Sequence, residues 1–143
     1  MFVPDDFEVP TELDTPLFSL RPLAMEHNGA DHAAWMSSID HIRSAPGFPD
    51  GRWPRPMTLD ENAQDIERHA SHFRERRGFT YTVLRDGDVI GCVYIYPRSE
   101  GGASVQSWVR ASHAEFDRPL YETVVEWLDK VWPFVEIEYV GRN

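Results

Sequence analysis

The spacing of apolar residues along the chain predicts five strands. Residues 17–23 alternate apolar and polar side chains, which is the period of a half-buried strand. Residues 79–85 and 89–96 are rich in aromatic and β-branched side chains, and the Asp-Gly-Asp sequence between them suits a tight hairpin. Two further segments, residues 103–110 and 135–139, show the same character and complete the predicted strands.

Apolar residues that recur every three or four positions predict three helices. The first helix spans about residues 31–42. The second begins at Thr58, which forms a capping box with the glutamate three positions later, and Gly78 is expected to end it. Asp117 is expected to cap the third helix, which ends before Pro133.

The predicted order is β-α-α-β-β-β-α-β, which places the chain in the α+β class. The run of strand, helix and final strand fits a right-handed crossover, so those two strands are expected to be parallel. Residues 1–14 are predicted to be an irregular, solvated acidic arm, because two prolines and five acidic residues interrupt them. Residues 15–143 are predicted to form one domain.

Charge and composition exclude several classes of function. The 143 residues include 14 basic and 24 acidic side chains, a formal net charge of −10, which argues against nucleic acid and anionic membranes as partners. No apolar run is long enough for a membrane helix, and the acidic N-terminus is unlike a secretory signal. A single cysteine, Cys92, fits a reducing cytoplasm, and its apolar strand predicts a buried, inert thiol.

The element order and four segments resemble the GNAT superfamily of acetyl-CoA-dependent N-acetyltransferases. The segments are LFSLRPL before two helices, the hairpin with Val89-Ile90-Gly91-Cys92-Val93 in its second strand, SVQSWVR before an amphipathic helix, and the closing VEIEYVGRN. The likeness covers about residues 16–143 and is strongest to the branch that includes ribosomal-protein N-terminal acetyltransferases. It implies acetyl-CoA as cofactor and an amine of a small molecule or peptide as acceptor. Gly91 is expected to permit a bulge or a close backbone approach, or to mark tight packing.

The resemblance also implies where the cofactor would lie. Trp108, Val109 and Arg110 match the strand whose backbone contacts pantetheine in the family, and their alternative role is ordinary strand packing. The family's next turn carries glycines that bring backbone N–H groups to the pyrophosphate. This chain has no glycine there and adds two acidic residues. Arg110, His113 and Arg118 are the cations that would compensate, unless they are solvated loop residues.

The acceptor side is predicted from a Pro-rich loop and from possible bases. Arg52, Trp53 and Arg55 combine an aromatic ring with two cations, in a segment that borders the acceptor site in the family. A buried Trp53 that merely covers the core is the alternative. The general base is not assigned, and its candidates are Glu100, His113 and Tyr96.

One helix face carries a spacing that suits metal ligands. Asp65, His69 and His72 lie at i, i+4 and i+7. The sequence supplies no obvious fourth ligand, so we predict a solvated helix face and no metal.

Two functions of different kind follow from these observations. The first is an N-acetyltransferase, and the second is a catalytically inactive GNAT-fold protein that binds a ligand or protein. Family members continue past the last strand into a helix that often carries a catalytic tyrosine, whereas this sequence stops at Asn143. The last strand is expected to be an exposed edge, through which residues 135–140 would form a homodimer.

Overall fold

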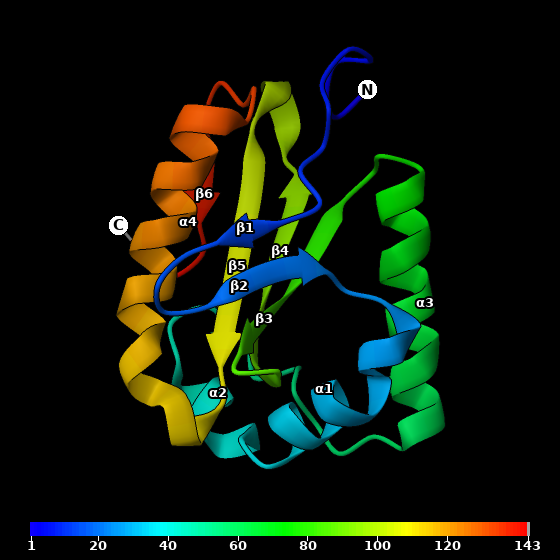
Figure 1. Ribbon diagram of the computed structural model, residues 1–143, viewed down its shortest axis with the longest axis vertical. Coiled ribbons are helices and arrows are strands. Elements are labelled where there is room, and N and C mark those ends of the chain that lie inside the picture. The colour runs from blue at the N-terminus through cyan, green and yellow to red at the C-terminus, as the bar shows by residue number, and fades with distance from the viewer. Residues whose placement is uncertain (143) are drawn as a thin grey trace.

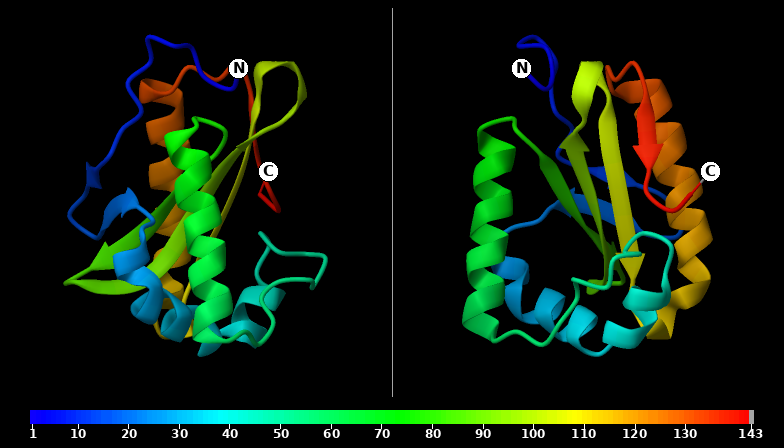
Figure 2. Two further views of the ribbon diagram at one scale, coloured as in Figure 1. Left: turned by 90° about the vertical axis from the view of Figure 1, so that its right-hand side faces the viewer. Right: turned by 180° about the vertical axis from the view of Figure 1, so that it is seen from behind.

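The computed structural model describes residues 1–142, apart from the side chain of Glu100, as a mixed sheet with helices on both faces. Figure 1 shows the sheet between α3 and α4, and the turned views in Figure 2 place these two helices on opposite faces of it. The helices are α1 (Asn28–Met36), α2 (Ile39–Ser44), α3 (Leu59–Arg74) and α4 (Asp117–Val131). Short 3-10 turns are η1 (Met25–His27), η2 (Ser99–Gly101) and η3 (Ala111–Phe116). The α+β class predicted from the sequence is confirmed.

The sheet has six strands, and their spatial order follows the chain. They are β1 (Leu13–Asp14), β2 (Ser19–Pro22), β3 (Phe79–Arg85), β4 (Asp88–Pro97), β5 (Ala103–Val109) and β6 (Ile137–Tyr139). Strands β1 to β5 pair antiparallel, whereas β5 and β6 pair parallel through the crossover of α4. The predicted parallel pair is therefore confirmed, and the strand β1 was not predicted.

Two apolar cores lie on the two faces of the sheet. Alternate residues of β4 divide between them, so that Val93 packs with α4 while Cys92 packs with α1 and α3. Trp35 of α1 and Trp108 of β5 are both almost fully buried in the α1/α3 core. The burial predicted for Cys92 is confirmed, and burial raises the pKa of its thiol well above the usual range.

The single helix predicted over residues 31–42 is wrong, because the chain breaks between α1 and α2. Ser37 turns its hydroxyl back to the carbonyl of Ala34 at 2.8 Å, and Ser38 leaves helical geometry with φ −132° and ψ 21°. Serine side chains compete in this way with helical hydrogen bonds. The Ser38 hydroxyl also accepts a hydrogen bond from the backbone N–H of Ala111 at 2.8 Å, which ties this break to the end of β5.

Two predicted helix boundaries are also wrong. Helix α3 ends before Gly78, and Arg76 takes the left-handed conformation with φ 61°. Gly78 instead leaves room for the ring of Tyr96, which a β-carbon at that position would overlap. Asp117 is the first helical residue of α4 rather than its cap, and it pairs with Arg142.

The acidic N-terminal arm is mostly irregular, but its apolar side chains pack on the domain. Val3 is only 2% exposed, and the ring of Phe2 stacks on Phe134 with centroids 5.0 Å apart. The guanidinium of Arg76 donates hydrogen bonds to the carbonyl of Phe7 at 2.9 Å and to that of Pro4 at 2.6 Å. This segment therefore belongs to the packed structure, which its acidic composition did not indicate.

No helix in the described residues 1–142 combines the length and apolar character that a membrane span requires.

Candidate functional site

The strands β5 and β6 separate soon after they pair, and the space between their diverging ends, which residues 46–48 occupy, is named the groove. Their register covers residues 103–105 of β5, and the last bond joins the N–H of Val140 to the carbonyl of Val105 at 2.8 Å. The segment at residues 46–48 fills the space beyond. The Gln106 side chain donates to the carbonyl of Gly47 at 2.9 Å, and a β-carbon on Gly47 would lie 3.0 Å from the backbone oxygen of Ser107.

On the side of the groove formed by the chain after β6, the segment 46–48 also makes a close backbone contact. Gly141 has φ +78°, and a β-carbon there would overlap the carbonyl of Pro46. The segment 46–48 thus lies between β5 and the chain after β6, with a glycine at each close approach. Figure 2 shows this loop (cyan, right-hand view) beside the end of β5.

Residues of the turn after β5 also form hydrogen bonds within the protein. The N–H of Ala111 donates to Ser38, and Arg110 donates to the carbonyl of Val89 at 3.3 Å. The Arg110 Nε is buried, with no hydrogen-bond partner in the described part of the chain. His113 bonds the neighbouring Ser112 hydroxyl at 2.8 Å.

The remaining residues predicted to contact a cofactor are Arg118, Trp108 and Val109. Arg118 is exposed, pairs with Glu122 at 3.3 Å and lies over the ring of Tyr121. Trp108 and Val109 are buried, and the indole N–H of Trp108 donates to the hydroxyl of Tyr94 at 2.9 Å. In this conformation residues 46–48 lie in the groove, and the Ala111 N–H at the start of the turn is already bonded to Ser38.

A cavity of about 280 Å³ lies between α1, α3 and the face of the sheet formed by β4 and β5. Its wall is part aromatic and part polar, and Trp35, Phe48, Trp53 and Tyr94 contribute aromatic rings to it. The ring centroids of Trp35 and Trp53 are 5.5 Å apart, and those of Phe48 and Trp53 are 5.3 Å apart. Leu23, Asp31, Asn62, Asp65, Ile66, Arg68, His69, Tyr96 and Gln106 complete the lining.

The loop predicted to bind an acceptor contributes one residue to this cavity. Trp53 lines it, and the backbone after it is held by a hydrogen bond of 2.7 Å from Arg43 to the carbonyl of Pro54. Arg52 and Arg55 are exposed and lie outside the lining. The structure therefore brings the aromatic residue of the motif into the cavity without its two cations.

A buried carboxylate, Asp31, is the residue of this site that sequence reasoning missed. Asp31 is 5% exposed, and Asn62 donates to its Oδ2 at 3.1 Å. The indole of Trp35 in turn donates to Asn62 Oδ1 at 3.0 Å. Burial raises the pKa of Asp31 to about 6, against the opposing effect of the Asn62 hydrogen bond. Its position four residues before Trp35, on the same helix face, was the available signal.

The predicted metal-like spacing on α3 serves a different arrangement. The Nδ1 atoms of His69 and His72 lie 2.8 Å and 2.9 Å from the hydroxyl of Tyr96, while Asp65 pairs with Arg68 at 3.2 Å. Burial lowers the pKa of His69 to about 4, so its ring is neutral at physiological pH. The prediction of a fully solvated face is therefore wrong for the two histidines.

Of the candidate bases, Tyr96 is the one placed at the cavity. Burial raises its pKa, so the hydroxyl is protonated. His113 lies in η3 beside Ser112, outside the cavity lining. The side chain of Glu100 lies outside the described part of the structure.

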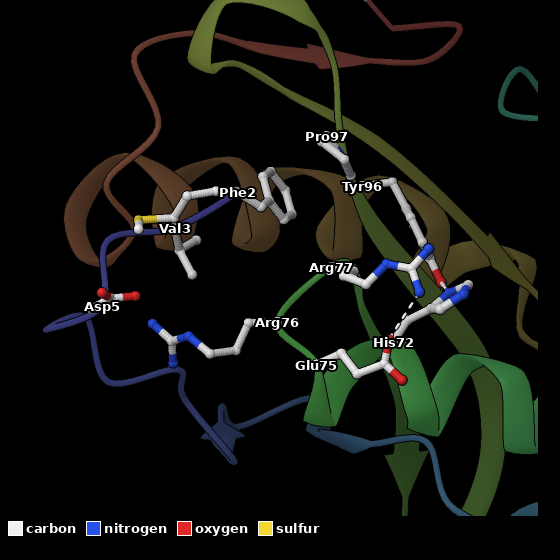
Figure 3. Close-up of a pocket in the computed structure, with 10 residues that line it drawn as sticks. Phe2, Val3, Asp5, His72, Glu75, Arg76, Arg77, Tyr96 and Pro97 are labelled. Carbon is white, nitrogen blue, oxygen red and sulfur yellow. Dashed lines mark hydrogen bonds and ion pairs between the residues drawn. The ribbon is translucent and has the colours of Figure 1, made fainter.

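A second, more open hollow of about 630 Å³ lies over the end of α3 and the N-terminal arm. Figure 3 shows Arg77 beside His72 and Tyr96, with its ion pair to Glu75. Arg76 points the other way and bonds the arm. Because these cations are already engaged and the hollow is open, the aromatic cavity is the better candidate site.

Comparison with known proteins identifies the fold. No protein-family model matches the chain, and a search of curated proteins found no match. Among solved structures, the ribosomal-protein-S5-alanine acetyltransferase of Vibrio fischeri aligns with a TM-score of 0.65 and 14% identity, covering 85% of this chain and 68% of that one. RimL, a ribosomal L7/L12 α-N-protein acetyltransferase, aligns with a TM-score of 0.66 and 11% identity, covering 91% and 71%.

A third structure, the microcin C7 self-immunity acetyltransferase MccE in complex with acetyl-CoA and AMP, aligns with a TM-score of 0.64 and 12% identity, covering 86% and 70%. The fold of this chain is therefore that of the GNAT acetyltransferases. The chain spans about two thirds of the length of these three neighbours.

Proposed function

We propose that this protein is a GNAT-fold binding module that uses its aromatic cavity, and that it does not transfer acyl groups from CoA in the conformation described. The observation that carries the proposal is the segment 46–48, which fills the groove between the separating strands. A fold alone does not define activity, because function depends on the residues of the site.

The packing of this segment supports a permanent rather than an incidental contact. Glycine occurs at both close approaches, Gly47 against Ser107 and Gly141 against Pro46. A β-carbon at position 141 would overlap the Pro46 carbonyl, and one at position 47 would make a tight contact with the Ser107 carbonyl. The side chain of Gln106 adds a hydrogen bond to the same segment.

The turn after β5 gives independent support. A phosphate group binds at such a turn through free backbone N–H groups and the positive end of a helix. Here the Ala111 N–H is bonded to Ser38, and Glu115 adds negative charge, while Asp117 is paired with Arg142. Arg118 lies beside Glu122, which lowers its value as a partner for a pyrophosphate.

An N-acetyltransferase acting on a peptide or small-molecule amine is the second candidate. It is favoured by the neighbours, since RimL has been solved in complex with coenzyme A and MccE with acetyl-CoA. For this candidate the segment 46–48 has to leave the groove before the cofactor enters.

Calorimetric titration with CoA and acetyl-CoA at low salt separates the two candidates. The binding module predicts no heat of binding up to millimolar ligand for the wild-type chain. Micromolar binding, followed by thiol release in the presence of an amine screen, would overturn the proposal and establish the transferase.

The variant Ser38→Ala sharpens the test, because it frees the Ala111 N–H without adding bulk. Ser112→Ala, one residue beyond Ala111, is the matched control. We expect neither variant to bind CoA, since the segment 46–48 still fills the groove. Micromolar CoA binding by Ser38→Ala alone would mean that the turn retains a phosphate site and would contradict the proposal.

A further inference from the structure

We propose that the aromatic cavity binds a compact organic cation, an N-methylated ammonium group, with its charge beside Asp31 and its methyl groups against the rings of Trp53 and Tyr94. This inference rests on the proposed function as a binding module and names its ligand class.

The size of the cavity limits the ligand. A volume of about 280 Å³ is at the lower end of small-molecule sites, which run from roughly 300 to 1,000 Å³. The rings on its wall are tilted rather than stacked, with interplanar angles of 49° between Trp35 and Trp53 and 78° between Trp53 and Tyr94. Rings at such angles present faces and edges in several directions to one guest.

The charges on the wall favour a cation. Asp65 and Arg68 pair with each other at the side of the cavity, and His69 is uncharged. The carboxyl of Asp31 is 5% exposed, accepts a hydrogen bond from Asn62 at Oδ2, and forms no ion pair with a cationic side chain among the described residues. A buried carboxylate is costly unless a positive charge or further hydrogen bonds compensate it. An ammonium ligand would supply that positive charge.

The aromatic wall favours methylated over free ammonium. A primary ammonium group brings three N–H donors, each of which needs an acceptor when it leaves water. The half-buried rings of Trp53 and Tyr94 offer π-faces instead. A cation over such a face gains up to about 2 kcal/mol when desolvated. The net charge of −10 raises the local concentration of cations around the whole molecule.

Choline and tetramethylammonium are suitable probes, with 3,3-dimethylbutan-1-ol as the neutral analogue of choline and n-butylamine as the primary amine. Binding is followed by calorimetry and by the intrinsic tryptophan fluorescence, to which Trp53 in the cavity contributes together with the four other tryptophans. We expect choline to bind at least tenfold more tightly than the neutral alcohol and the primary amine. Equal affinity for the alcohol, tighter binding of the amine, or no binding of either cation at millimolar concentration would overturn the inference.

Two variants with the same change in net charge test the role of the carboxyl. Asp31→Asn keeps the size of the side chain and an oxygen that accepts from Asn62, and it is expected to weaken choline binding at least tenfold. Asp129→Asn removes an exposed charge on α4 and is expected to leave binding unchanged. Equal effects of the two variants would show that only the overall charge matters, which would refute the assignment to Asp31.

Titration with CoA separates a failure of the cation site from a failure of the proposed function. CoA is titrated into the same preparations, and its binding reports on the groove rather than the cavity. CoA binding with thiol release, together with choline binding, would overturn the function as a module without acyl transfer and leave the cation site standing.

Discussion

Replacing the buried carboxyl of Asp31 by an amide is expected to stabilise the protein at neutral pH. Burial raises the pKa of this carboxyl from 3.8 to about 6 in the folded protein. Each pKa unit corresponds to 1.36 kcal/mol, so the ionised group costs the folded state about 3 kcal/mol. Asp31→Asn removes that cost and keeps an acceptor for the Asn62 side chain.

The same two pKa values of Asp31 determine whether the stability of the folded protein rises or falls with pH. Between pH 3.8 and about 6 the folded protein holds a proton on Asp31 that the unfolded chain has lost. The contribution of this group to stability therefore falls as the pH rises through that window and reaches its full cost above about pH 6. The advantage of Asp31→Asn is expected to be largest above pH 6 and to vanish below pH 4.

His69 changes the stability of the folded protein in the opposite direction to Asp31, over a similar range of pH. Burial lowers its pKa from 6.5 to about 4, so between these values the unfolded chain binds the extra proton. Stability from His69 then rises with pH by about 3 kcal/mol, which offsets the loss from Asp31. We expect a nearly flat contribution of the pair in the wild-type protein and a clear rise in stability between pH 4 and 6.5 in Asp31→Asn.

Urea unfolding at pH 4, 5, 6 and 7.5 measures these free energies for the wild-type chain, for Asp31→Asn and for the exposed control Asp129→Asn. The control is expected to change stability by less than about 0.5 kcal/mol at every pH. An Asp31→Asn protein that is no more stable than the wild type at pH 7.5, or whose advantage is the same at pH 4, would refute the reasoning.

Three further changes test other features of the fold. Gly78→Ala places a β-carbon on the ring of Tyr96 and is expected to cost about 1–3 kcal/mol in urea unfolding; no loss would contradict the close contact. Thr58→Ala removes the capping box with Glu61 and is expected to cost about 1 kcal/mol, measured by thermal melting, and an unchanged melting temperature would mean that the cap is not formed in solution. If β6 forms a homodimer edge, Ile137→Pro is expected to halve the mass seen by light scattering, whereas a folded variant of unchanged mass would reject that interface.

Much of the fold follows from local signals in the sequence. The aromatic and β-branched residues of β3 and β4 and the Asp-Gly turn between them predicted the hairpin, and Asp86 and Gly87 indeed have positive φ angles of 52° and 82°. The capping box at Thr58 predicted the start of α3. These features depend on residues a few positions apart, so a single sequence contains the necessary information.

The candidate site depends on contacts that local patterns do not contain. Asp31 and Asn62 are 31 positions apart, and His69 meets Tyr96 across 27 positions. The segment 46–48 belongs to a Pro- and Gly-rich loop without periodicity, so nothing in its own sequence indicated that it enters the groove beside β5. The composition gives the net negative charge of the chain, but it does not indicate that the carboxyl of Asp31 is buried.

The packing of the N-terminal arm has a consequence for how the chain is made. Phe2 stacks on Phe134, and Phe7 packs on Trp132 with centroids 5.3 Å apart, so these contacts join residues that lie far apart along the chain. During synthesis on a ribosome, the side chains of Phe2 and Phe7 therefore stay exposed until α4 and the residues after it have been made. Such long-range closure slows folding and favours association of incomplete chains. Yield of folded protein should therefore respond to the rate of translation and to chaperones more strongly than the small size of the domain suggests.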